Sequence, residues 1–97
     1  MSPEQRELAR HALGLPNKRR ESFRNHYAID AGCPDHDLWL AMVAAGEARR
    51  RANVAWMGGM DQFWLTRSGA ESALEPKERL DPEDFPDPST KGPSDER

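Results

Sequence analysis

The sequence predicts a small α+β domain of about three helices and one β-hairpin, followed by a disordered acidic tail. Three observations lead to this prediction: segments bounded by helix-start and helix-stop signals, a Gly-Gly pair between two β-prone runs, and five of the eight prolines within residues 76–97. At 97 residues, the chain has room for one domain. We expect that domain at residues 1–75. Residues 76–97 hold too few apolar side chains to offset the entropy cost of ordering them.

The first helix has clear signals at both ends. Ser2 suits the N-cap, Pro3 suits the first helical position, and Gln5 completes a capping box. Gly14 suits the left-handed residue that ends a helix. These signals predict a helix over residues 3–13.

Residues 16–35 carry the fewest signals. A short helix over residues 21–27 would place Phe23 and Tyr27 four residues apart on one helix face. An extended stretch over residues 23–29 is the alternative. We favour a short helix or an irregular loop.

A second helix is expected over residues 36–45, with Asp35 as its N-cap and Gly46 as its end. Its residues are apolar nearly all round, which predicts a helix buried on every side. Trp39 is therefore expected in the core.

The Gly-Gly pair at residues 58–59 predicts a β-hairpin with a two-residue turn, since glycine readily adopts positive φ. The register that follows places Val54 opposite Phe63 and Ala52 opposite Leu65, all four on one face. After the hairpin, a Thr-capped helix is expected over residues 67–74, with Thr66 as the N-cap.

This order of elements resembles the second half of a winged-helix domain. The resemblance rests on Met42-Val43-Ala44-Ala45-Gly46-Glu47-Ala48-Arg49-Arg50 and on Phe63-Trp64-Leu65-Thr66-Arg67-Ser68-Gly69-Ala70-Glu71-Ser72-Ala73-Leu74. Bacterial winged-helix regulators of the MarR and PadR type carry a similar pattern. It implies a winged-helix-like domain in which residues 36–45 match the recognition helix and the hairpin matches the wing. The family also has a complete helix-turn-helix, for which residues 16–35 offer at most one short helix.

A second resemblance is to small uncharacterised proteins of bacteriophages and prophages. It is carried by residues 9–18 (ARHALGLPNK), by Arg24-Asn25-His26-Tyr27, and by the Gly-Gly hairpin before Phe63-Trp64-Leu65-Thr66. The resemblance implies a phage-encoded accessory protein that acts in the bacterial host cell. It implies no activity.

Charge is distributed unevenly along the chain. Residues 1–70 hold ten Lys and Arg against eight Asp and Glu, whereas residues 71–97 hold four against nine. A solubilising segment is the plainer interpretation of the acidic tail. Alternatively, its acidic residues 81–87 shield a basic patch of the same chain or bind a basic partner.

A single cysteine, Cys33, excludes an internal disulfide framework and suits a reducing compartment. The first residues lack the apolar segment of a signal peptide, and no apolar run approaches the length of a membrane span. We therefore expect a cytoplasmic protein that has no membrane partner. A domain this small also makes a homodimer an open possibility.

Two basic clusters suggest nucleic-acid binding, because Lys and Arg neutralise phosphates and release counterions. The first holds Lys18, Arg19 and Arg20 with Arg24 and His26, and the second holds Arg49, Arg50 and Arg51. A solvated charged surface is the alternative, and residues 49–51 cannot all point one way if they alternate along a strand. The residues expected to contact nucleic acid are Lys18, Arg19, Arg20, Arg24, Arg49, Arg50 and Arg67.

The hairpin also carries a composition typical of protein-binding hot spots. Exposed tryptophan with neighbouring methionine is common at such surfaces. The residues of this alternative site are Trp56, Met57, Met60 and Trp64, and on the expected register at least one of the two tryptophans is exposed. The corresponding function is a module that modulates a host protein.

The sequence carries no pattern typical of an enzyme. It lacks a phosphate-binding glycine loop, a nucleophile elbow and a paired-carboxylate motif. Cys33 and His36 have a C-x-x-H spacing, but a structural zinc site needs four ligands. We therefore expect no catalytic residues, no metal and no cofactor.

Overall fold

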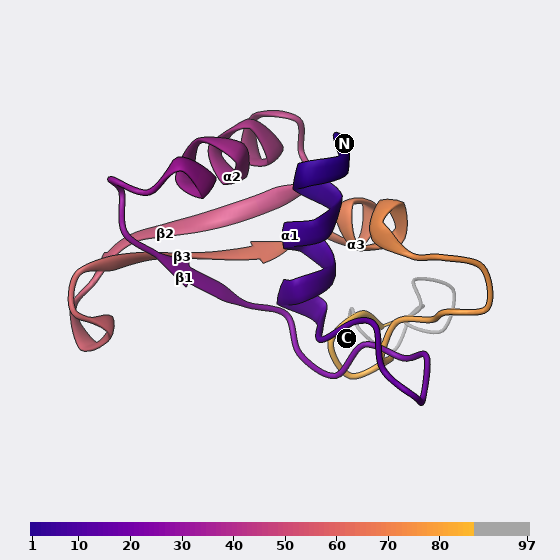
Figure 1. The fold of residues 1–97 in the computed structure, drawn as a ribbon. Helices are drawn as coiled ribbons and strands as arrows, with labels where there is room; N and C mark the ends of the chain where they lie inside the picture. The colour runs from indigo at the N-terminus through magenta and orange to yellow at the C-terminus, as the bar shows by residue number, and fades with distance from the viewer. Residues whose placement is uncertain (87–97) are drawn as a thin grey trace, which may run out of the picture.

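Within residues 1–86, the part of the chain that the computed structural model describes, three antiparallel strands form one sheet against which helices pack (Figure 1). Residues 87–97 of the expected tail lie outside the described part. The strand order is β1-β3-β2. The elements are α1 (Pro3–Leu13), β1 (Tyr27–Ile29), α2 (Pro34–Ala44), β2 (Ala48–Val54), the 3-10 turn η1 (Ala55–Met57), β3 (Met60–Leu65) and α3 (Arg67–Ala73).

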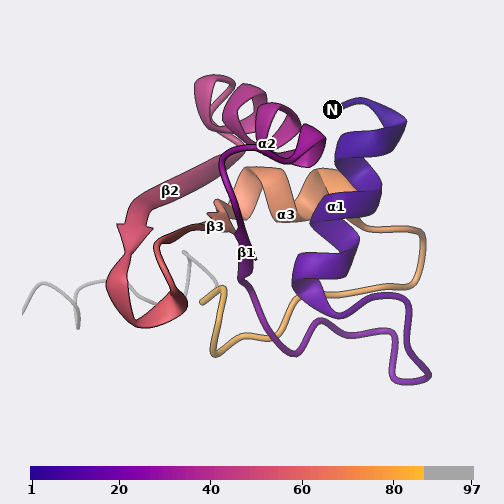
Figure 2. The ribbon, with the colours of Figure 1, turned by 60° about the vertical axis from the view of Figure 1, so that its left-hand side comes forward.

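The core lies between one face of the sheet and the helices. Trp39 of α2 is fully buried, as expected, and its ring stacks on Phe63 of β3 at 5.3 Å between centroids. Tyr27 of β1 contacts Trp39 on one side and His11 of α1 on the other. The tip of the β2–β3 hairpin projects away from α1 and α3, as both Figure 1 and Figure 2 show.

Helix α1 has the predicted bounds. Ser2 Oγ accepts a hydrogen bond from the Gln5 backbone N–H at 3.1 Å, and Gln5 Oε1 accepts one from the Ser2 N–H at 2.8 Å. Gly14 ends the helix in the left-handed region, at φ 82°. Each end of the helix is therefore set by signals within a few residues of that end.

Of the two favoured interpretations, the helix over residues 21–27 is wrong, whereas the irregular loop is correct as far as His26. Residues 27–29 form β1, which pairs with β3, so the extended alternative is correct for that part. Phe23 is 57 % exposed and so offers no buried surface for a helix face. The irregular backbone instead satisfies the end of α1: the Phe23 N–H donates to the Leu13 carbonyl and the His26 N–H to the Ala12 carbonyl.

A single helix, α2, lies between β1 and β2 in the described chain. Residues 16–35 therefore do not complete a helix-turn-helix. Helix α2 begins two residues earlier than expected, with Cys33 rather than Asp35 at the N-cap. It is also not buried all round. His36, Trp39 and Met42 are buried against the sheet, whereas the outward positions are exposed because no described element covers them.

The hairpin has a longer connection than the expected two-residue turn. The turn η1 precedes Gly58 and Gly59, and the register shifts between Arg51 and Val54. Phe63 consequently lies opposite Arg50, and Leu65 lies opposite Ala48, so the predicted register is wrong. Asn53 adopts φ 50° within this irregularity, which the alternation of the strand does not reveal.

Helix α3 begins as predicted, and Thr66 Oγ1 accepts a hydrogen bond from the Gly69 N–H at 3.1 Å. It ends at Ala73, one residue before the expected end. Gly69 packs against the chain after α2: a Cβ placed there would lie 1.9 Å from the Glu47 carbonyl oxygen. The glycine thus allows α3 to approach the start of β2.

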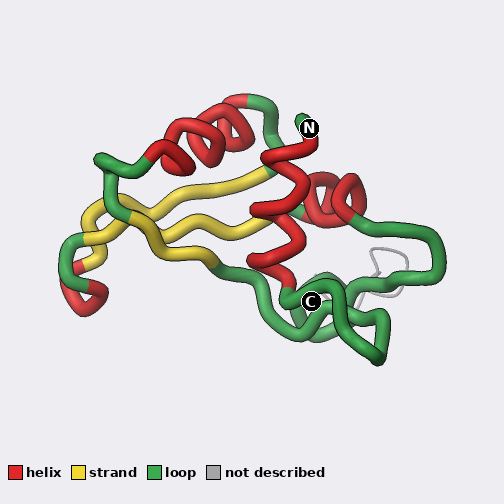
Figure 3. Tube along the Cα trace, viewed as in Figure 1, coloured by secondary structure: helices red, strands yellow, loops and turns green. Residues whose placement is uncertain are grey.

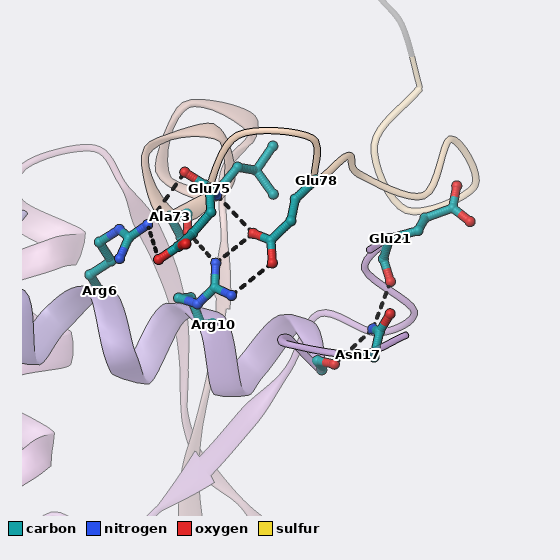
Figure 4. Close-up of polar contacts among 9 residues, drawn as sticks. Arg6, Arg10, Asn17, Glu21, Ala73, Glu75 and Glu78 are labelled. Carbon is teal, nitrogen blue, oxygen red and sulfur yellow. Dashed lines mark hydrogen bonds and ion pairs between the residues drawn. The ribbon is translucent and has the colours of Figure 1, made fainter. Parts of the chain in front are cut away.

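Residues 76–86 pack on the domain, so the boundary expected at residue 75 is too early. Phe85 is buried in the core, and the Ser22 backbone N–H donates a hydrogen bond to the Arg79 carbonyl. Figure 3 shows this segment beside the loop after α1. In Figure 4, Arg10 forms two hydrogen bonds with the Glu78 carboxylate, at 2.6 and 2.8 Å. One buried ring and one paired carboxylate anchor a segment that its proline content predicts to be disordered.

Candidate nucleic-acid interface

The face of the sheet opposite the core is the strongest candidate for a functional surface. Successive side chains of a strand point to opposite faces. Because Phe63 and Leu65 point into the core, Gln62 and Trp64 of β3 point the other way. Their β2 partners on this face are Arg51, opposite Gln62, and Arg49, opposite Trp64. We call these four residues the outer sheet face.

The outer sheet face is accessible and positively charged. Arg49 and Arg51 are exposed, and Trp64 and Gln62 are half-buried. Neither arginine forms an ion pair within the described chain. The remaining residue directed to this face by β1 is Ala28, which pairs with Gln62. None of these five side chains is acidic, so the charge that the described strands place on this face is positive.

Arg50 lies between these two arginines and has a different role. It points to the core face, where its Nε and Nη2 donate to Asp61 Oδ2 at 2.9 and 2.7 Å. His36 Nε2 lies 2.6 Å from the same oxygen, and the Asn53 N–H donates to Asp61 Oδ1 at 2.9 Å. His36 also contacts the Phe63 ring edge-on. Through these hydrogen bonds, the Asp61 carboxylate of β3 is linked to α2 and β2.

Asp61 is a buried anion with a complete set of partners. Its exposed fraction is 3 %. The hydrogen bonds from His36, from the Asn53 backbone and from Arg50 hold the pKa of the Asp61 carboxyl far below its ordinary value, although burial opposes this effect. A charge at the core face of the hairpin therefore fixes Arg50 inward. The outward orientation of its neighbours Arg49 and Arg51 follows.

A shallow hollow adjoins the outer sheet face at the end where β2 begins. Its lining includes Val43 from α2, Arg49 from β2, Trp64 from β3 and Thr66. The hollow lies at the opposite end of the hairpin from the exposed tip. It extends the accessible surface around the Trp64 ring.

The first basic cluster lies elsewhere. Lys18, Arg19 and Arg20 are exposed in the loop after α1, and Arg19 pairs with Glu21 at 3.3 Å. This loop lies far from β2 in both Figure 1 and Figure 2. The two basic clusters therefore do not form one surface.

Two other predicted contact residues are used inside the fold. Arg24 donates from Nη2 to the His11 carbonyl at 2.8 Å, and its guanidinium lies over the Phe23 ring. Arg67 donates to the Phe85 and Pro86 carbonyls and pairs with Glu71. With Arg50, and with Arg19, which pairs with Glu21, they make four of the seven expected residues whose charged groups are engaged within the chain.

The tryptophans and methionines of the alternative site do not form one patch. Trp56, in the turn η1, is 75 % exposed, which confirms that at least one hairpin tryptophan is exposed. Met57 and Met60 lie half-buried beside it. Trp64 lies four residues along β3 from Met60, a separation of about 14 Å at about 3.4 Å per residue.

Arg51 belonged to a predicted basic cluster but was not among the expected contact residues, and sequence reasoning missed Gln62 and the buried Asp61 network. Alternation places Arg51 and Gln62 on the face opposite Phe63 and Leu65, but their pairing depends on the true register, which shifts near Asn53. The signal for Asp61 was present in the alternation Asp61, Phe63, Leu65, which places an acidic residue on the core side of β3.

Within residues 1–86, no group of three or more His, Cys, Asp or Glu side chains is placed to hold a metal ion. Cys33 is exposed at the start of α2. None of the described helices is both long and apolar enough to cross a bilayer. Comparisons of the chain with protein-family models, curated proteins and solved structures returned no match.

Proposed function

We propose that this chain is a non-enzymatic accessory or regulatory protein of the phage type, which binds nucleic acid through its outer sheet face. The observation that carries the proposal is the pairing of Arg49 and Arg51 with Trp64 and Gln62 on one accessible surface without acidic side chains. Unpaired arginines attract phosphates. When they neutralise phosphates, counterions leave the nucleic acid, and the affinity therefore depends on salt.

A winged-helix-like architecture is the finer part of this proposal. A helix, a hairpin and a Thr-capped helix follow one another, which supports it. The hairpin then corresponds to the wing, and its outward arginines replace the function of a recognition helix. The single helix between β1 and β2 is the point at which the chain departs from that architecture.

Reversal of the two free arginines tests the proposal. We expect Arg49→Glu combined with Arg51→Glu to abolish binding of a labelled DNA at low salt, measured by fluorescence anisotropy. The matched control is Lys18→Glu with Arg20→Glu, which changes the net charge equally in the distant loop. The control should bind nearly as well as the natural chain. Equal losses in both variants would mean that net charge, and not the outer sheet face, governs binding.

The second candidate function is a protein-binding module that modulates a host protein. The 75 % exposed Trp56 favours it, because tryptophan is enriched at the hot spots of protein interfaces. In this case Trp56→Ala should remove the interaction with the host protein, and reversal of Arg49 and Arg51 should leave it unchanged. Affinity purification with both variants distinguishes the two functions.

A further inference from the structure

The helices of the described chain have no free basic surface with which to enter a DNA groove. Helix α2 contains no Lys or Arg, and its first turn carries Asp35 and Asp37. A recognition helix contacts bases from its N-terminal residues, where these carboxylates would repel phosphates. Helix α2 is therefore poorly suited to a duplex.

The arginines of the other two helices are already paired. Arg6 and Arg10 of α1 bind Glu75 and Glu78, as Figure 4 shows. Arg67 of α3 binds Glu71 and two backbone carbonyls. Arginines without an ion pair in the described chain lie next to an aromatic ring on the outer sheet face instead.

We propose that the outer sheet face takes single-stranded nucleic acid, an inference that rests on the proposed function. The ring of Trp64 serves as a platform for a base, and Arg49, directly opposite it, contacts the adjoining phosphate. Bases expose their faces for such stacking only where they are unpaired. Arg51 contacts a second phosphate, and Gln62 supplies an amide for a base edge.

The dimensions of the hairpin fit this occupant. The strand from Trp64 to Met60 spans about 14 Å, the length of about four nucleotides at a spacing of about 3.4 Å within one strand. The Asp61 network fixes β2 against β3, so that the ring and the two arginines keep their relative positions.

The test compares a labelled single strand of about 12 nucleotides, within the range of known single-strand site sizes, with a duplex of the same sequence. Anisotropy titrations at low salt should show at least about fivefold tighter binding of the single strand. Trp64→Leu keeps an apolar side chain but removes the ring, and should weaken single-strand binding about fivefold or more. Trp64→Phe should retain most of the affinity, and it shows that substitution at this position is tolerated.

The remaining outcomes separate the single-strand inference from the proposed function. Equal or tighter binding of the duplex overturns the single-strand inference and leaves nucleic-acid binding in place. Unchanged single-strand affinity in Trp64→Leu likewise overturns the inference, because the ring would then carry no base. Absence of binding to both probes at low salt overturns the proposed function and the inference together.

Discussion

At the scale of single residues, Arg49, Arg50 and Arg51 have different roles although they are adjacent and chemically identical. Alternation along β2 directs Arg50 to the buried Asp61 carboxylate and leaves its neighbours in solvent. Alternation separates Arg50 from its two neighbours. The β3 residue that each arginine faces depends on the register, which shifts between Arg51 and Val54 at the irregularity near Asn53.

Replacement of these arginines by alanine should separate stability from binding. Arg50→Ala leaves the buried Asp61 with fewer partners and should lower the free energy of unfolding by about 1 kcal/mol or more. The Arg50 side chain is 38 % exposed, which reduces the effect. Arg49→Ala, the matched control, should change stability by less than about 0.5 kcal/mol. Urea denaturation measures both, and similar losses would contradict the assigned roles.

The Asp61 carboxylate should also make stability depend on pH in the acid range. Its pKa is lower in the folded chain than in the unfolded chain, where it is near 3.9. Its contribution is therefore complete at neutral pH and is lost as the pH falls below about 4. Asp61→Asn should be less stable than the natural chain at pH 7, with a smaller difference near pH 3. A difference that stays constant between these pH values would show that the charge of Asp61 is not responsible.

At the scale of elements, the helices with local end signals could be predicted from the sequence. The capping box of α1 and the Thr66 cap of α3 involve residues three positions apart. Strand β1 and the hairpin register could not be predicted, because they depend on partners far along the chain. Tyr27, for example, lies opposite Phe63. The candidate site was predicted in part for the same reason: Arg49 and Trp64 were expected, whereas their pairing was not.

The packing of α3 on the chain before β2 gives a prediction at this scale. Gly69→Ala would place a Cβ against the Glu47 carbonyl and should cost about 1–3 kcal/mol of stability, as overpacking does. Gly32→Ala is the control, since a Cβ there meets no atom within 4 Å and φ is not positive. Thermal denaturation should show a lower Tm for the first variant alone. Equal Tm values would mean that α3 does not approach Glu47 closely.

At the scale of the whole molecule, the C-terminal segment is part of the fold as far as Phe85. The composition of this segment predicts disorder, because a low apolar content does not reveal that the single Phe85 ring is buried in the core. Arg10 and Glu78 add an ion pair between the first helix and this segment, with both side chains largely buried. Contacts therefore hold the C-terminal segment, residues 76–86, against α1 near the start of the chain.

Phe85→Ala should accordingly destabilise the domain by about 3 kcal/mol, the usual cost of removing a buried aromatic ring. Phe23→Ala removes the same ring from a position that is 57 % exposed and should cost distinctly less. Chemical denaturation of both variants tests the difference. Loss of equal size in the two would place Phe85 outside the core.

The central claim is that the outer sheet face binds nucleic acid, and an NMR titration of the labelled protein with a short single-stranded oligonucleotide tests it most directly. The three tryptophan indole N–H groups act as separate reporters, and Trp39 is a buried control. We predict shifts of the Trp64 indole and of the Arg49 and Arg51 amides, while the Trp39 indole and the amides of residues 18–20 stay in place. Shifts confined to residues 18–20, with none at Trp64, would contradict the account.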